Sequence, residues 1–530
     1  MADIIVIGAG HNGLVCAYYL ARAGHVVTVL EKRDVVGGAA VTEEFHPGFR
    51  NSVAAYTVSL LNPKVIADMD LPRHGLSVVE REISNFLPLN DREYLKVGGG
   101  KTKPEVAKFS ARDADRLDAY GEHLDVVADL LRDLVLETPP NAVSGRGLLA
   151  VLPQLFKVGT LGRRIARLPA AMQQQVLNLF TQSAGDYLDQ WFESAPIKAA
   201  YGFDGIVGNY ASPYAAGSAY VLLHHVFGEV NGKKGAWGHA IGGMGAITQA
   251  MARACSEAGV TIRTGTGVKR VLTDKFGVTG VETSSGEVIK AGAVVSNLNP
   301  KLLFTRMIEQ GVLPQPFSRR MESWKCGSGT FRMNVALSEL PGFTCLPGKT
   351  RAEHHTAGII IAPSLAYMED AWMDARRDGW SKQPIVEILI PSTLDETLAP
   401  KGAHVASLFC QHVAPTLPDG KSWDDHREEV ADLMIATVDR FAPGFKKSVI
   451  ARQINSPLDL ERTFGLVGGD IFHGALGLDQ LFSARPMLGY ADYRTPVKGL
   501  YQCGSGTHPG GGVTGAPGHN AAREMLRDLR

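Results

Sequence analysis

The residues best suited to chemistry lie in two glycine-rich stretches, one near each end of the printed sequence. The first comprises Gly8, Ala9, Gly10, His11, Asn12 and Gly13. Glycine at position 8 permits a tight turn, glycine at 10 lets the backbone approach a phosphate, and glycine at 13 lets a helix pack closely on a strand. Glu31 follows about twenty residues later, where a carboxylate binds ribose hydroxyls and repels a 2'-phosphate. This stretch therefore predicts an adenine dinucleotide other than NADP.

These residues need a strand, a turn and a helix in that order to position them. Residues 3–7 form an apolar run typical of a buried parallel strand, and apolar residues then recur at helical spacing from Leu14 to Ala21. Gly24 ends the predicted helix, and residues 26–30 give a second strand with Glu31 at its end. Amide groups at the helix N-terminus would then face the phosphate charge.

The segment after Glu31 indicates which dinucleotide is bound. It resembles the segment that passes beside FAD in flavoproteins typified by amine oxidases and phytoene desaturases, and NAD-only dehydrogenases usually lack its glycine pair. The resemblance implies FAD rather than NAD. It also implies an adenine-side contact near Val268 and cofactor contacts from Lys32, Arg33, Gly37, Gly38 and Ala39.

The second glycine-rich stretch follows an apolar run at 499–503 and precedes a helical segment at 519–526. Glycine at this density indicates that a flat, bulky group passes close to the backbone. A helix N-terminus here would place positive charge beside the flavin and stabilise its anionic reduced form. The expected cofactor contacts are Gly504, Ser505, Gly511, Gly512 and Val513.

Two histidines, His473 and His508, lie in glycine-rich turns that could face the flavin ring. Imidazole titrates near neutral pH, so each is a candidate for moving a proton, although we favour a structural role for each. His224 and His225 have no carboxylates at metal-ligand spacing, and the 6 cysteines form no C-x-x-C motif. Neither a metal site nor a redox dithiol is therefore expected.

The chain as a whole predicts an α/β protein: a Rossmann-type FAD-binding domain, like those of glutathione reductase and amine oxidases, with an inserted α+β substrate domain. The FAD-binding domain is expected at 1–75, 236–300 and 456–530, and the substrate domain at 76–235 and 301–455.

The substrate domain is expected to combine a helical insertion with a mostly antiparallel sheet. Residues 111–137 repeat apolar side chains at helical spacing, and the aromatic-rich segment 173–230 could line an apolar pocket with few polar anchors. Strand-like runs occur at 332–337, 358–362, 385–390 and 404–411, and a helix is expected at 428–441.

The segment 148–168 is amphipathic, with Lys157, Arg163, Arg164 and Arg167 among its apolar positions. A core helix with a solvated basic edge is favoured, and peripheral contact with an anionic membrane is the alternative. The composition is 45% hydrophobic and 20% charged with a net charge of zero, which gives no support to a nucleic-acid partner. With no signal sequence or membrane span expected, a cytoplasmic enzyme is the prediction.

At its two glycine-rich ends the chain resembles the phytoene desaturase and retinol saturase family of FAD oxidoreductases. Residues 505–513 are similar to that family's C-terminal flavin motif and residues 8–38 to its N-terminal one, while 469–475 and 478–486 match a narrower branch. The resemblance implies FAD and a reaction at carbon–carbon bonds of an apolar, carotenoid-like or lipid substrate, by hydride transfer to flavin N5.

Three alternatives to this function stay open: a flavin amine oxidase, a redox-neutral isomerase that uses reduced FAD, and a flavin-binding scaffold without turnover. The sequence does not choose among oxygen, a quinone and a nicotinamide as electron acceptor. It also leaves the oligomeric state undetermined, with a homo-oligomer among the alternatives.

Overall fold

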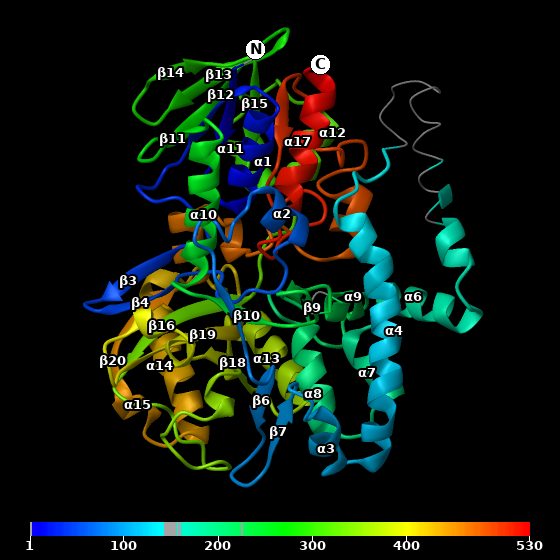
Figure 1. The fold of residues 1–530 in the computed structure, drawn as a ribbon, viewed down its shortest axis with the longest axis vertical. Helices are drawn as coiled ribbons and strands as arrows, with labels where there is room; N and C mark the ends of the chain where they lie inside the picture. Colours follow the sequence, from blue (N-terminus) through cyan, green and yellow to red (C-terminus); the bar gives the residue numbers. More distant parts are fainter. Residues whose placement is uncertain (1–2, 142–155, 157–158, 161, 224–225) are drawn as a thin grey trace.

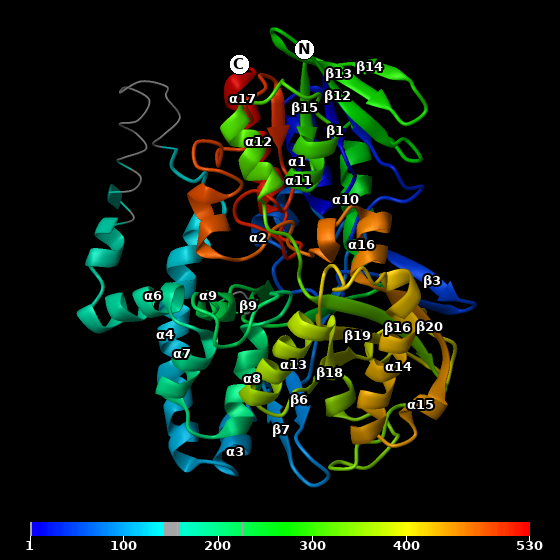
Figure 2. The same cartoon turned by 180° about the vertical axis from the view of Figure 1, so that it is seen from behind.

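The computed structural model describes residues 3–141, 156, 159–160, 162–223 and 226–530. Two large sheets organise these residues, one parallel and one mostly antiparallel, in two halves stacked along the long axis of the molecule (Figure 1). Both ends of the chain lie in the half with the parallel sheet, which Figure 2 shows from behind.

The parallel sheet has β1 at its centre, and each neighbouring pair of its strands is parallel. In spatial order its strands are β11 (Thr261–Arg263), β2 (Val26–Leu30), β1 (Asp3–Ile7), β15 (Ala293–Ser296) and β21 (Leu500–Gln502). The apolar residues of β1 are buried on both faces, as a parallel sheet covered on both sides requires.

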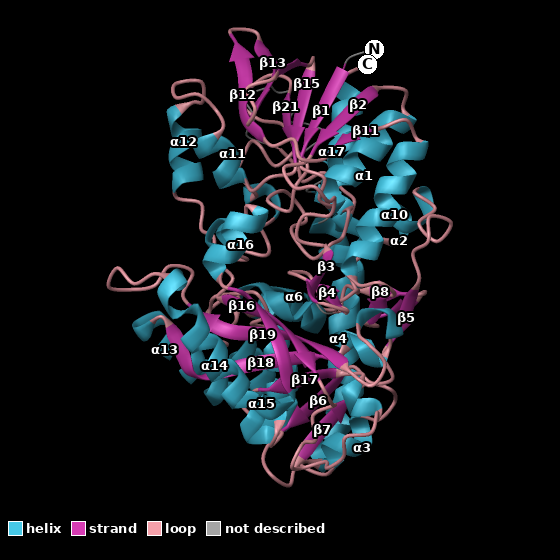
Figure 3. Cartoon of the chain, turned by 90° about the vertical axis from the view of Figure 1, so that its left-hand side faces the viewer, coloured by secondary structure: helices cyan, strands magenta, loops and turns pink. Residues whose placement is uncertain are grey.

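Ile4 and Val6 of β1 pack on one face of this sheet, and Ile5 and Ile7 pack on the other. The elements on the first face are α1 (His11–Arg22), α10 (Met244–Glu257) and α17 (Ala516–Asp528). Those on the second are α11 (Pro300–Arg306), α12 (Gln315–Glu322) and the sheet of β12 (Val268–Asp274), β13 (Gly277–Thr283) and β14 (Val288–Lys290). Figure 3 shows both layers, and the arrangement confirms the predicted Rossmann-type α/β fold.

The seven-stranded sheet lies below the parallel sheet in Figure 3. Its neighbouring strands are antiparallel apart from the β17–β6 pair. The four strand-like runs noted in the sequence form β16 to β19. In spatial order the strands are β20 (Val449–Asn455), β16 (Thr330–Leu337), β19 (His404–Val413), β18 (Trp380–Leu389), β17 (Gly358–Ile361), β6 (Asn85–Pro88) and β7 (Tyr94–Val97).

Helices cover both faces of this second sheet. One face packs on α14 (Trp423–Phe441), which includes the helix expected at 428–441. The other packs on a helical layer: α4 (Ala111–Val135), α6 (Ala170–Thr181), α7 (Ala184–Trp191), α8 (Ala195–Asp204), α9 (Ala219–Leu222) and α13 (Leu365–Asp378). Smaller elements are α2 (Pro63–Asp68), α3 (Thr102–Ala107), α15 (Phe445–Ser448), α16 (Pro457–Phe464) and the strand pairs β3 (Thr42–His46) with β4 (Phe49–Ser52), β5 (Val78–Glu80) with β10 (Gly238–Ala240), and β8 (Glu229–Val230) with β9 (Lys233–Lys234).

Part of the amphipathic segment 148–168 lies outside the described residues. His224 and His225 also lie outside them. Within its described part, Arg164 forms an ion pair with Asp133 on α4. Across the described ranges, we find no helix with both the length and the apolar character needed to cross a membrane.

The domain boundaries expected from the sequence stay a prediction. Helices α11 and α12 follow residue 299 and pack in the core beneath β1, whereas the β3–β4 hairpin contacts β16, β19 and β20 of the other half. Two segments therefore pack in the half of the molecule that holds the other expected domain: α11 and α12 pack beneath the parallel sheet, and the β3–β4 hairpin packs on the seven-stranded sheet.

Helices α1 and α17 touch closely at Gly518, where a Cβ would collide with the carbonyl oxygen of Asn12. We expect Gly518→Ala to force the helices apart and lower the free energy of unfolding by about 1–3 kcal/mol. The matched control is Gly121→Ala in α4, where a Cβ meets nothing within 4 Å. Helix propensity predicts a gain of up to about 1 kcal/mol there. Denaturant unfolding measures both, and an unchanged Gly518→Ala variant would contradict the packing argument.

Candidate active site

The two glycine-rich stretches meet at the carboxyl end of the parallel sheet. Asn12 Nδ2 donates a hydrogen bond of 3.3 Å to Ser505 Oγ, although 493 positions separate the two residues. Beside them, the Gly37 amide donates to the Ala9 carbonyl oxygen at 2.9 Å, and Gly37 pairs with Gly10 in a short parallel bridge. Segments from both ends of the sequence thus form one continuous surface.

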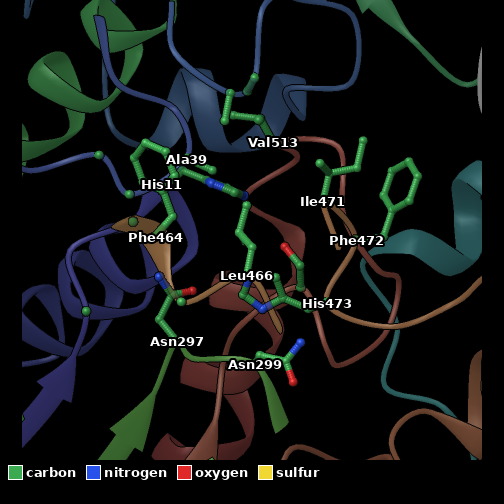
Figure 4. Close-up of a pocket in the computed structure, with 18 of the residues that line it drawn as sticks. His11, Ala39, Asn297, Asn299, Phe464, Leu466, Ile471, Phe472, His473 and Val513 are labelled. Carbon is green, nitrogen blue, oxygen red and sulfur yellow. The ribbon is translucent and has the colours of Figure 1, made fainter. Parts of the chain in front are cut away.

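A cavity of about 680 Å³ runs along this surface and continues to the seven-stranded sheet. Figure 4 shows part of it, with His11, Asn297, His473 and Val513 around the opening. The predicted site residues that line it are Gly8, Gly10, His11, Glu31, Lys32, Arg33, Gly37, Gly38, Ala39, Val268, His473, Ser505, Gly512 and Val513. Those that do not are Ala9, Asn12, Gly13, Gly504, Gly511 and His508. The roles of all these residues stay predictions.

The turn after β1 has the features of a dinucleotide site. Helix α1 begins without a side-chain cap, so the amides of its first turn remain available to a phosphate. His11 Nε2 and Asn12 Oδ1 are buried without a hydrogen-bond partner among the described residues. The Glu31 carboxylate accepts hydrogen bonds from the amides of Ala9 at 2.8 Å and Arg33 at 2.9 Å, which hold it at the cavity wall. These residues fit FAD.

Asn297 is a residue of this site that the sequence analysis missed. It follows β15, and its Nδ2 lies 2.6 Å from where a Cβ on Gly10 would stand. The absence of a side chain at Gly10 therefore also makes room for the Asn297 amide. A polar residue directly after a buried parallel strand was the available signal, since ligands of such sheets bind at the strands' carboxyl ends.

The structure separates the two histidines that the sequence proposed as proton handlers. His473 lines the large cavity, has a φ of 60°, and its Nδ1 has no partner within the described chain. His508 instead lines a smaller cavity of about 260 Å³, where its Nε2 lies 3.0 Å from the Leu134 carbonyl oxygen. Burial lowers the pKa of His473 to about 3 and that of His508 to about 4, so both are neutral at physiological pH.

Arg485, also missed, joins the two loops that flank the cavity. Its buried guanidinium donates to the carbonyl oxygens of Phe472 at 2.6 Å, Ser505 at 2.8 Å and Gln480 at 3.0 Å. Asp470 binds the same region through the amides of Gly327 at 2.7 Å and Phe472 at 2.8 Å. Burial lowers the pKa of Arg485 to about 10, so the guanidinium keeps its charge. A single cation thus fixes His473's loop to the C-terminal glycine loop.

The part of the cavity near the seven-stranded sheet is more polar than expected. Of the described residues in the aromatic-rich segment 173–230, Phe203, Asp204 and Val207 line the cavity, because most of the described rings pack in the core of the helical layer. Several polar side chains line it instead. They are Tyr56, Thr57, Arg81, Asn85, Asp204 and Glu387.

Replacing Arg485 tests the link between the loops. Arg485→Met would leave three backbone carbonyls without their donor, so we expect a loss of about 3–5 kcal/mol in unfolding free energy and weaker retention of FAD. The control is Arg73→Met, which removes an exposed arginine paired at the surface with Asp70 and Glu257. Flavin absorbance after gel filtration and thermal melting are the measurements. Equal flavin content in both variants would refute the assignment.

The buried histidines predict a pH dependence of stability. Burial lowers the pKa of His11 to about 4 and that of His473 to about 3, from 6.5 in the unfolded chain. Between these pKa values and 6.5, the unfolded chain binds protons that the folded protein does not bind. The free energy of unfolding should therefore be constant above pH 7 and fall progressively from about pH 6.5 toward pH 4. Thermal melts across this range should show a shallower slope for His473→Gln, and an identical slope would count against the prediction.

Comparisons with known proteins agree with this geometry. The flavin-containing amine oxidoreductase family matches residues 13–330. Rat pyridine nucleotide-disulfide oxidoreductase domain-containing protein 2 is 40% identical over 545 aligned residues, which cover 100% of this chain and 94% of that protein. The lycopene-forming phytoene desaturase of Pantoea ananas is 23% identical and aligns over 100% of both chains.

A solved structure of an oxidoreductase from Methanosarcina mazei superimposes with a TM-score of 0.62 at 16% identity, covering 99% of this chain and 100% of that one. These findings confirm the predicted resemblance, with the rat protein in the narrower branch and the desaturase as a more distant relative. They also confirm FAD as the cofactor. The chain therefore belongs to the flavin-containing amine oxidoreductase family and is an FAD-dependent oxidoreductase.

Proposed function

We propose that this oxidoreductase acts on carbon–carbon bonds of an apolar small molecule of isoprenoid or lipid type. The observation that carries the proposal is one cavity that joins the glycine-rich surface to apolar side chains of the other half, including Phe203, Val207 and Phe409. When bound, FAD supplies the acceptor for the two electrons removed from the substrate. The likeness to phytoene desaturase supports the same class of substrate.

The chain's own contribution is to hold such a substrate and exclude water. An apolar chain offers few groups for hydrogen bonding, so close packing against Leu60, Trp237 and the residues above would orient it. The domain boundaries stay a prediction, peripheral membrane contact stays the alternative to a core helix, and the electron acceptor and oligomeric state stay open.

Of the two predicted proton handlers, His473 is the better placed. It lines the cavity, and its neutral ring has an Nδ1 atom without a partner among the described residues. A neutral imidazole can accept the proton lost beside the reacting C–H bond, although its lowered pKa makes it a weak base. His508 lines the smaller cavity, with its Nε2 near the Leu134 carbonyl.

Amine oxidation is the second candidate. The carboxyl groups of Asp204 and Glu387 line the cavity, and either of them, when ionised, would bind an ammonium group. The description of the matching family also favours it.

Anaerobic mixing with candidate substrates separates these functions. Bleaching of the oxidised flavin band by isoprenoid or lipid compounds, with little bleaching by amines, is the expected outcome. Bleaching by amines alone would replace the proposal with amine oxidation. Product without bleaching would indicate isomerisation, and neither across a broad panel would favour a scaffold without turnover.

The histidine assignment is tested in the same experiment once a bleaching substrate is known. Loss of general base catalysis typically costs 10²–10⁴-fold, and we expect His473→Gln to slow flavin reduction by about 10²-fold because the base is weak. His508→Ala serves as the comparison. Equal reduction rates in the wild type and His473→Gln would remove His473 from the mechanism, and a slower His508→Ala would return the role to His508.

A further inference from the structure

A charged row crosses the face of the seven-stranded sheet that meets the cavity. Glu387 in β18 lies opposite Phe409 in β19, and Phe409 lies opposite Arg332 in β16. Residues directly opposite on neighbouring strands point to the same face, so these three side chains are neighbours. Glu387 and Phe409 line the cavity, and each charged residue of the row stands between apolar, buried residues of its own strand.

Arg81 and Asn85 lie close to Glu387 of this row. Gly358 in β17 has no side chain, and this leaves a space that Arg81, Asn85 and Glu387 surround. A Cβ on Gly358 would lie 2.8 Å from Asn85 Oδ1, 3.0 Å from Glu387 Oε1 and 3.5 Å from Arg81 Nη1. Both Arg81 and Asn85 line the cavity, and Arg81 also hydrogen-bonds to Thr57 Oγ1. Polar atoms from three strands or loops therefore surround one small volume at this end of the cavity.

The charged groups of this cluster are Arg81, Glu387 and Asp204, which line the cavity, and Arg332 in the same row as Glu387. The Glu387 carboxylate already accepts a hydrogen bond of 2.5 Å from the Tyr56 hydroxyl. The Arg332 guanidinium lies 4.3 Å from the centre of the Tyr56 ring and donates to Ser407 Oγ at 2.6 Å. Its Nε and Nη1 atoms are buried with no hydrogen-bond partner among the described residues. Of the two guanidinium groups near Glu387, that of Arg81 lines the cavity and that of Arg332 packs against the Tyr56 ring.

Burial acts on both acidic side chains here, and it raises the pKa of Glu387 as well as that of Asp204. Burial, reinforced by the nearby Glu387, raises the pKa of Asp204 well above its usual range, which favours the neutral acid. Burying a charge without a partner is costly, so a guanidinium group that lines a cavity, as that of Arg81 does, can bind an anion there. Guanidinium groups bind carboxylates in particular, because their N–H groups match the two oxygens.

We propose that this polar end, formed by Arg81, Asn85, Glu387 and Tyr56, binds the carboxylate of an acid with a long apolar chain, with Arg81 as the principal partner. The inference rests on the proposed function and narrows it, since the substrate becomes a carboxylic acid of isoprenoid or fatty type rather than a hydrocarbon. The chain carbons would lie along Phe203 and Val207, between the polar end and the glycine-rich surface.

The test is a binding titration of the FAD-loaded protein with three probes of equal chain length: dodecanoate, dodecanol and dodecylamine, each below its aggregation threshold. A shift of the flavin absorption spectrum reports binding without requiring turnover. A charged hydrogen bond is worth about 1.5–3 kcal/mol, so dodecanoate should bind about tenfold or more tightly than dodecanol. Dodecylamine should bind more weakly than either.

Variants at two positions, Arg81 and Gly358, locate the effect. Arg81→Met should reduce the affinity for dodecanoate to that for dodecanol, whereas Arg81→Lys should retain part of the difference. Gly358→Ala, which fills the space among the three polar atoms, should weaken dodecanoate without removing a charge. Arg377→Met is the control, since the exposed Arg377 pairs with Asp374 and Asp378 away from the cavity. Flavin content and thermal melting show whether each variant is folded.

Equal affinity for the acid and the alcohol, tighter binding of the amine, no binding of any probe, or an unchanged Arg81→Met variant would each overturn the inference. Its failure is distinct from failure of the proposed function. Flavin bleaching by uncharged isoprenoids, combined with equal binding of acid and alcohol, would leave the proposed function standing without the carboxylate site. Binding of dodecanoate that depends on Arg81, with flavin bleaching by amines alone, would support the carboxylate site and overturn the proposed function.

Discussion

Contact between the first and last helices is the constraint on which the cofactor surface depends. Helix α17 packs on α1 so closely that Gly518 has no room for a side chain. This contact places the C-terminal glycine loop over the turn after β1, where Asn12 reaches Ser505. Arg485 then fixes that loop to the segment carrying His473. The surface is therefore assembled by contacts among the most distant parts of the sequence.

The two halves of the molecule contribute to the cavity by different physical means. The parallel sheet presents backbone amides and glycines, which suit phosphates and a flat ring because no side chain stands in the way. The mostly antiparallel sheet presents side chains, among them Glu387 and Phe409. Under the proposed function, the parallel sheet would hold the cofactor and the other sheet would hold the substrate.

The dinucleotide half could be predicted closely, because its glycine turn, its helix and Glu31 depend on local spacing. The substrate half could not, because its polar end forms from strands paired across the sheet, and register cannot be deduced from one sequence. The same limit applies to His508, whose glycine-rich neighbourhood predicted the flavin side although the side chain lines the smaller cavity. Charged residues inside apolar strands, such as Glu387 and Arg332, were the signal available for the cluster.

The edge position of β21 in the parallel sheet has a consequence for biosynthesis. During translation β1, β2 and α1 leave the ribosome first, while β21 and α17, which complete their sheet and helical layer, follow after all the other strands. Until then the edge of β15 lacks its partner, and an open edge of this kind favours aggregation. The cofactor surface of a nascent chain therefore forms only after synthesis has passed α17, and until β21 has been made β15 presents an open edge.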